Sequence, residues 1–214
     1  MNKFLSSWRL FAILTLVISI GVLLGILTGV PTTIDGMHAI AANAVRWSIP
    51  PFVAAFAASP IAKLWPSKTG RWLLANRRYL GLAFAVGMGL HLLILAWLGF
   101  AQPKYFTENF VNWRTAVLGG VPYVVLALMA ITSFRRYARH VSRATWRRLH
   151  KAGMYIFSTI IVVAYIQYLL EGKDGPNLYR FLILCALLCI WGLRFAAWRR
   201  HRVTVPARAP DFRG

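Results

Sequence analysis

Residues 79–98 read YLGLAFAVGMGLHLLILAWL, a stretch without Asp, Glu, Lys or Arg that is long enough to cross a bilayer as a helix. His91 lies deep within it, in Gly87-Met88-Gly89-Leu90-His91-Leu92-Leu93. A bare imidazole in hydrocarbon is costly, so a histidine at this depth needs a bonding partner or a function. The stretch therefore predicts a transmembrane helix and marks His91 as a candidate functional residue.

Five further apolar runs of similar length account for most of the rest of the chain. Only 14% of the 214 residues are charged, against about a quarter in soluble domains, and 58% are hydrophobic. These features predict an all-α polytopic membrane protein that folds as a six-transmembrane-helix bundle. We expect a single membrane domain over residues 1–214, with a short, basic, disordered tail at 199–214. The six expected spans are Leu10–Leu27, Trp47–Leu64, Tyr79–Leu98, Ala116–Phe134, Met154–Leu170 and Phe181–Trp198.

The basic residues are concentrated at the two ends of the chain and in every second connection between these spans. Of the 25 Lys and Arg, 20 fall in residues 1–9, 63–78, 135–151 and 194–213, while the acids concentrate in the other connections. Basic residues gather on the cytoplasmic side of membrane proteins, so both termini are expected to be cytoplasmic. The net charge of +20 is thus explained by topology, with membrane lipids as partners and no nucleic acid.

Polar groups inside the spans are few. No run has an acid in its interior, which argues against a hydrolase with paired carboxylates and against the carboxylate relays of many transporters. Cys185 and Cys189 stand four apart in the last run, where a packing role is expected. The interior serines Ser59 and Ser158 lack an obvious histidine partner and are expected to bond back to their own helices.

Two of the five histidines stand out, namely His91 and His150, which begins the fifth run after Trp146-Arg147-Arg148-Leu149. From the residues alone, His91 is either a hydrogen-bonded packing residue or a haem ligand. The glycines at 87 and 89 would let a flat macrocycle approach the backbone closely. Both interpretations stay open at this point.

Two motifs carry a family resemblance. The stretch Arg77-Arg78-Tyr79-Leu80-Gly81-Leu82 … His91 and the stretch Trp146-Arg147-Arg148-Leu149-His150 resemble the ferric-reductase-like transmembrane domain family over roughly residues 40–200. The closest similarity is to the haem-binding membrane subunits of bacterial periplasmic methionine-sulfoxide reductase systems. The resemblance implies six helices with both termini inside, location in the bacterial inner membrane, and b-type haem (haem b) that carries electrons across it. His91 and His150 would be the metal and cofactor ligands.

The chain departs from this family pattern at two positions. Those subunits have a further histidine thirteen residues after the one matching His150, where this chain has Val163. Larger relatives have one fourteen residues before the match to His91, where this chain has Arg77. Depth adds a mismatch, because His91 lies ~20 Å beyond Arg78 along its helix and His150 only ~3 Å beyond Arg148 at the α-helical rise.

The function expected from the resemblance is an oxidoreductase-type electron-transfer subunit. Electrons would come from a cytoplasmic flavin reductase, a bound flavin such as FMN, or quinol, and would leave to an external acceptor such as a periplasmic redox enzyme. The alternative is a degenerate, haem-free family member that serves as a structural or assembly partner in a membrane complex. A transporter is a third and weaker hypothesis, because the chain has neither buried acids nor short, interrupted spans.

Overall fold

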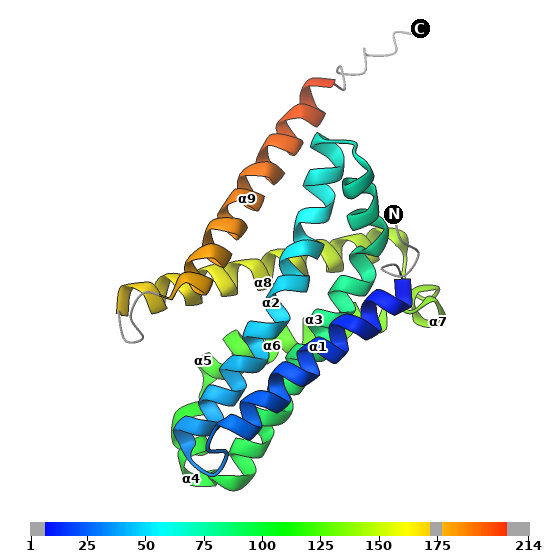
Figure 1. The fold of residues 1–214 in the computed structure, drawn as a ribbon. Helices are drawn as coiled ribbons and strands as arrows, with labels where there is room; N and C mark the ends of the chain where they lie inside the picture. The colour runs from blue at the N-terminus through cyan, green and yellow to red at the C-terminus, as the bar shows by residue number, and fades with distance from the viewer. Residues whose placement is uncertain (1–6, 172–176, 205–214) are drawn as a thin grey trace, which may run out of the picture.

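The computed structural model describes residues 7–171 and 177–204, and all its regular elements in these ranges are helices (Figure 1). Four of them are short and lie between α3 and α8. The helices are α1 Ser7–Thr28, α2 Ile34–Leu64, α3 Lys68–Ala101, α4 Pro103–Phe110, α5 Trp113–Thr115, the π-helix η2 Ala116–Gly120, α6 Val121–Ile131, α7 Arg135–Ala138, α8 Arg143–Glu171 and α9 Leu178–Thr204. The all-α prediction is thereby confirmed for the described residues.

Five segments are long and apolar enough to cross a membrane: α1, α3, residues 113–131, α8 and α9 up to Arg200. The remaining expected run, Trp47–Leu64, lies in α2, which is not among the five. This helix has three prolines and many alanines, and thirteen of its residues are buried. Its composition suits the interior of a bundle, where small side chains allow close packing, better than a surface in contact with lipid.

α2 occupies the centre of the fold and packs against α1, α3 and α9. Its contact with α3 is close at Gly87, where a Cβ would collide with the Ser48 hydroxyl. α1 is held by the Asn43 side-chain amide, which donates to the carbonyl of Gly21 at 2.7 Å. Thr33 and Ser67 cap α2 and α3 by accepting hydrogen bonds from backbone N–H groups three residues ahead.

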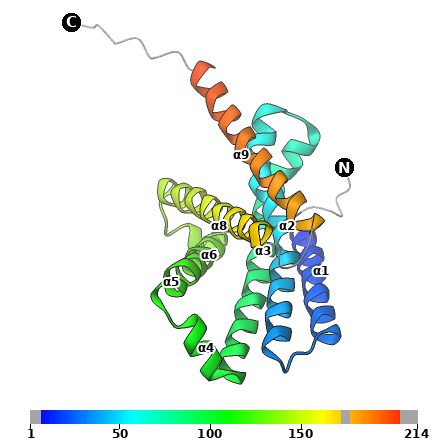
Figure 2. The same ribbon diagram turned by 90° about the vertical axis from the view of Figure 1, so that its left-hand side faces the viewer.

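α8 does not run alongside α2 and α3 but lies across them in both views (Figures 1 and 2). It packs against α6 and α9, and α6 also contacts α3. Depths counted along α8 and along α3 therefore refer to different axes, so the estimates of ~3 Å and ~20 Å made from the sequence cannot be compared directly.

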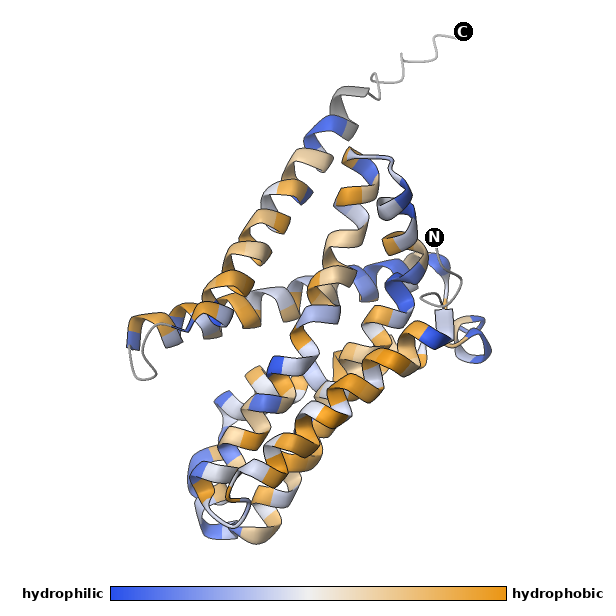
Figure 3. Ribbon diagram, viewed as in Figure 1, coloured by the Kyte–Doolittle hydropathy of each residue, from blue (hydrophilic) through white to orange (hydrophobic). Residues whose placement is uncertain are grey.

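α9 continues to Thr204, beyond the expected end of the last span at Trp198. The start of the predicted disordered tail, residues 199–204, is thus helical, and residues 205–214 lie outside the described part. Hydrophilic residues gather around α7, the start of α8 and the connection between α2 and α3, whereas apolar residues cover most of α1 (Figure 3).

Candidate cofactor site

A cavity of about 700 Å³ lies where α2, α3, α6, α8 and α9 meet. Its wall combines apolar side chains, basic side chains and one histidine, His150. The residues that line it include Phe52, Ser59, Lys63, Arg77, Arg78, Gly81, Phe84, Leu126, Met129, Ser133, Trp146, Arg147, His150, Lys151, Met154, Phe157 and Arg194.

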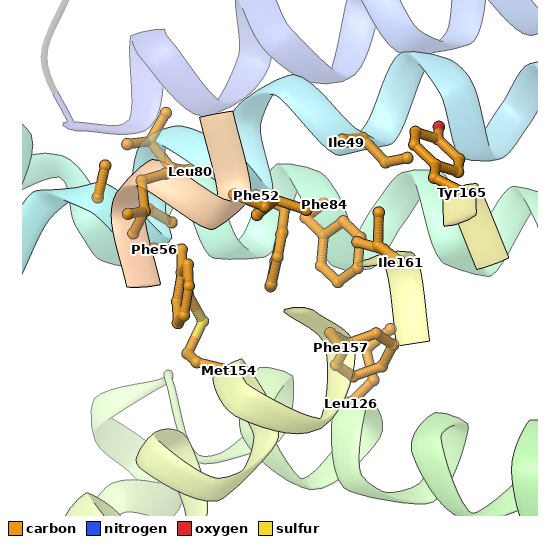
Figure 4. Close-up of a cluster of buried hydrophobic side chains, with 14 of the residues drawn as sticks. Ile49, Phe52, Phe56, Leu80, Phe84, Leu126, Met154, Phe157, Ile161 and Tyr165 are labelled. Carbon is orange, nitrogen blue, oxygen red and sulfur yellow. The ribbon is translucent and has the colours of Figure 1, made fainter. Parts of the chain in front are cut away.

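One part of this wall belongs to the main hydrophobic core. Phe52 from α2 and Phe84 from α3 approach Phe157 from α8, with ring centroids 4.8 to 6.4 Å apart (Figure 4). Leu126 and Met154 belong to the same buried cluster. This part of the cavity suits a flat apolar body rather than a polar metabolite.

Six cationic side chains also line the cavity, and no carboxylate among the described residues joins them. Three of the four basic segments seen in the sequence contribute to this group, so they lie at one end of the fold. The fourth segment is adjacent, because the Arg78 guanidinium lies 5.5 Å from the centroid of the Trp8 ring. The expected one-sided charge is therefore present, although the orientation of that side in a membrane stays a prediction.

The guanidinium groups of this lining are only partly bonded. An Nη of Arg77 donates to Ser59 Oγ at 3.0 Å, and an Nη of Arg194 donates to the carbonyl of Phe56 at 2.8 Å. The Nε atoms of Arg78 and Arg194 are buried and have no hydrogen-bond partner among the described residues. Unpaired buried donors cost free energy, so this end of the cavity is suited to an anionic group that would accept from them.

His150 is held from one side. Its Nδ1 lies 3.1 Å from the carbonyl oxygen of Trp146, and its ring stacks on the Trp146 indole with centroids 4.1 Å apart. A carbonyl only accepts, so the Nδ1 carries the proton and Nε2 the lone pair.

The Nε2 of His150 lies 3.5 Å from Ser133 Oγ, at the limit of a hydrogen bond. The Ser133 hydroxyl is 2.8 Å from the Met129 carbonyl and donates there. Its proton is then directed away from the imidazole, so Ser133 donates no strong hydrogen bond to His150 Nε2. A neutral imidazole with this tautomer is a common metal ligand.

His91 lies elsewhere. Its Nδ1 is 2.9 Å from the carbonyl oxygen of Ala41, and its ring lies parallel to that of Tyr123 with centroids 6.4 Å apart. It does not line the cavity, whose last contribution from α3 is Ala85, six residues or about 9 Å earlier along the helix. The structure thus does not bring His91 and His150 to one cavity.

Of the other positions named from the sequence, some line the cavity and some do not. Arg77, which stands where larger relatives have a histidine, lines the cavity. Val163, at the position of the expected third histidine, is 48% exposed and does not line it. Gly87 faces α2 rather than open space, so the close approach expected there is made by Ser48, while a Cβ at Gly89 would meet no atom.

Sequence reasoning missed some of the lining. The charge pattern assigns Arg194 to the basic end of the chain, but an arginine inside an apolar run also indicates a buried partner. Ser59 accepts from Arg77, and Ser158 accepts from Trp191 Nε1 at 2.7 Å, so both bond to side chains of other helices. These pairs join residues far apart in the chain and had no local pattern.

A family model described as "Ferric reductase like transmembrane component" matches residues 44–162, more than half of the chain. The matched segment includes His91 and His150, five of the six cationic cavity residues, and the cavity contributions of α2, α3 and α6. Comparisons with curated proteins and with solved structures gave no match.

Proposed function

Because the chain belongs to the ferric reductase-like transmembrane family, we propose that it is a membrane electron-transfer subunit that holds a b-type haem in the cavity beside His150. The observation that carries the proposal is the combination of an imidazole oriented through its Nδ1, aromatic walls and a cluster of cations in one cavity. When bound, haem would supply one-electron redox chemistry.

Each part of the lining has a role in this proposal. His150, oriented by the Trp146 carbonyl and indole, would hold the haem iron. Phe52, Phe84 and the rest of the aromatic wall would exclude water from the macrocycle. The unpaired N–H groups of Arg78 and Arg194 would donate hydrogen bonds to the propionates.

His91 is not needed for this cavity. Its hydrogen bond to Ala41 agrees with the packing interpretation, in which a polar side chain bonds across two membrane helices. The proposal therefore depends on His150, and His91 provides the matched control.

The proposal extends to the electron route. The subunit would take electrons from a cytoplasmic flavin reductase, a bound flavin such as FMN, or quinol, and pass them across the bacterial inner membrane to an external acceptor. A periplasmic redox enzyme of the methionine-sulfoxide reductase type is the acceptor that the sequence resemblance favours. This direction requires that the basic end of the fold, where the cavity lies, faces the cytoplasm.

The test compares His150→Ala with His91→Ala in protein purified with haem supplementation. We expect a Soret band and about one haem per chain by pyridine haemochrome in the parent and in His91→Ala, and loss of most haem in His150→Ala. A parent chain without a Soret band would overturn the proposal. Equal haem content in all three proteins would remove His150 from it.

One observation favours a second candidate function, a haem-free structural or assembly partner. The two family histidines do not meet at one cavity, and the expected third one is Val163. A scaffold would keep its function in cells when His150 is replaced by alanine, whereas an electron carrier would lose it.

A further inference from the structure

The cavity reaches the surface of the protein beside three exposed cations. Lys63 at the end of α2 and Arg147 and Lys151 on α8 line the cavity and are exposed, whereas the other three cations of its lining are half-buried. Arg147 and Lys151 stand four residues apart and therefore share one face of α8. We call Lys63, Arg147 and Lys151 the rim of the cavity.

Two apolar side chains of the same lining are also exposed. Leu74 of α3 is 48% exposed and Trp146 of α8 is 37% exposed. A free inorganic anion would use the cations of the rim but would gain nothing from these apolar surfaces. A ligand that joins an anionic head group to a hydrocarbon chain would contact both kinds of side chain, and its binding would include both contributions.

No acid neutralises the rim from within the cavity, because no carboxylate among the described residues lines it. The rim also belongs to the basic end of the fold, which the charge pattern assigns to the cytoplasmic side. Basic pockets between membrane helices on that side are typical binding sites for anionic lipid head groups. Charge complementarity and the adjoining apolar surface therefore favour the same class of ligand.

We propose that the rim binds the phosphate group of an anionic phospholipid, whose hydrocarbon chains cover Leu74 and Trp146. The inference goes beyond the proposed function, because it requires neither haem nor the imidazole of His150. It also narrows the general expectation of membrane lipids as partners to one site with three named cations.

The test measures lipid binding to the full chain in a neutral detergent by native mass spectrometry. Phosphatidylglycerol is the anionic probe, and phosphatidylcholine with the same acyl chains is the probe without net charge. We expect the protein to bind phosphatidylglycerol about tenfold or more tightly than phosphatidylcholine at an ionic strength of about 0.15 M, where distant exposed charges are screened.

The rim variant is Lys63→Gln/Arg147→Gln/Lys151→Gln. It should bind phosphatidylglycerol about tenfold or more weakly than the parent, while its affinity for phosphatidylcholine changes by less than about threefold. Lys63→Gln alone should weaken phosphatidylglycerol binding about threefold or more. This single change at an exposed side chain provides the measurement if the triple variant does not fold.

A matched control removes the same amount of charge from the same basic segments. Lys68, Arg143 and Arg148 are exposed and do not line the cavity. The variant Lys68→Gln/Arg143→Gln/Arg148→Gln should therefore lose less than about threefold in phosphatidylglycerol affinity. Equal losses in the rim variant and in this control would overturn the site, because affinity would then follow net charge alone.

Two further outcomes would overturn the inference. Equal affinity of the parent for the two lipids would show that the rim does not select an anionic head group. Displacement of bound phosphatidylglycerol by an excess of inorganic phosphate would show that the rim holds a free anion and not a lipid. The haem content of the same samples keeps the two proposals apart, since a chain without a Soret band that still distinguishes the lipids would contradict only the proposed function.

Discussion

His150 stacks on Trp146 and donates its Nδ1 proton to the carbonyl oxygen of the same residue, with ring centroids 4.1 Å apart and a donor–acceptor distance of 3.1 Å. The Trp146 indole is itself fixed, because its Nε1 donates to the Thr132 carbonyl at 3.1 Å. One residue thus determines both the rotamer and the tautomer of the proposed haem ligand, and this side chain is in turn tied to the end of α6.

Trp146→Ala keeps the backbone carbonyl but removes the stacked ring. We expect the variant to release haem faster than the parent, with an apparent affinity lower by about tenfold or more, the usual cost of removing a residue that orients a metal ligand. Trp146→Phe, which keeps an aromatic ring but not the bond to Thr132, should lie between the two. Haem transfer to an excess of a scavenging apoprotein measures the effect, and identical release rates in all three proteins would contradict it.

Gly87 and Gly89 form a matched pair for helix packing. Gly87→Ala would drive a Cβ into the Ser48 hydroxyl and to within 3.1 Å of the Ile18 side chain, whereas Gly89→Ala meets no neighbour. We expect the first change to destabilise the protein by about 1–3 kcal/mol as overpacking does, and the second to be neutral or to stabilise it by up to about 1 kcal/mol. Unfolding in detergent should show the difference.

Ser48→Ala provides the internal check on this pair. Removing the hydroxyl should relieve part of the clash, so Gly87→Ala should cost less free energy in the Ser48→Ala background than in the parent. Equal costs in both backgrounds would mean that the two helices shift apart rather than collide.

The sequence predicted the helical class and the membrane segments well because both depend on local properties. Apolar runs of about 20 residues signal spans, and five were found as expected. α2 shows the limit of this signal, since a helix surrounded by others can be rich in alanine and proline and still be central. Burial by neighbouring helices leaves no trace in a hydropathy window.

The site was predicted only in part, for a physical reason. His150 could be recognised because it stands beside Trp146 and Arg147 in sequence, and all three line the cavity. Arg194 and Ser59 reach the same cavity from helices far along the chain, which only packing brings together. The crossing of α8 over α2 and α3 likewise depends on how side chains of different helices pack together. The depths of His91 and His150 along their own helices therefore do not give the distance between the two residues.

A buried hydrogen bond joins α8 to α9 and allows another prediction. Ser158 is fully buried and accepts from Trp191 Nε1 at 2.7 Å. Trp191→Phe should destabilise the protein by about 1–3 kcal/mol, because it leaves the Ser158 hydroxyl without this partner. The double variant with Ser158→Ala should recover part of this loss, giving a coupling energy of about 0.6–1.7 kcal/mol, as found between membrane helices. Additive effects in a double-mutant cycle would argue against the bond.

The orientation of the basic end decides which way electrons would move, and it can be measured without any cofactor. We expect both termini in the cytoplasm, because 20 of the 25 basic residues lie on that side of the expected topology. A reporter enzyme that folds only outside the membrane should be inactive when fused after residue 214 and active when inserted at residues 31–33, between α1 and α2. A cytoplasmic fluorescent reporter should give the opposite pattern. If the fusion at residue 214 were active outside, the cavity with His150 and Arg77 would open away from the cytoplasm, and a cytoplasmic flavoprotein could not be the direct donor to it.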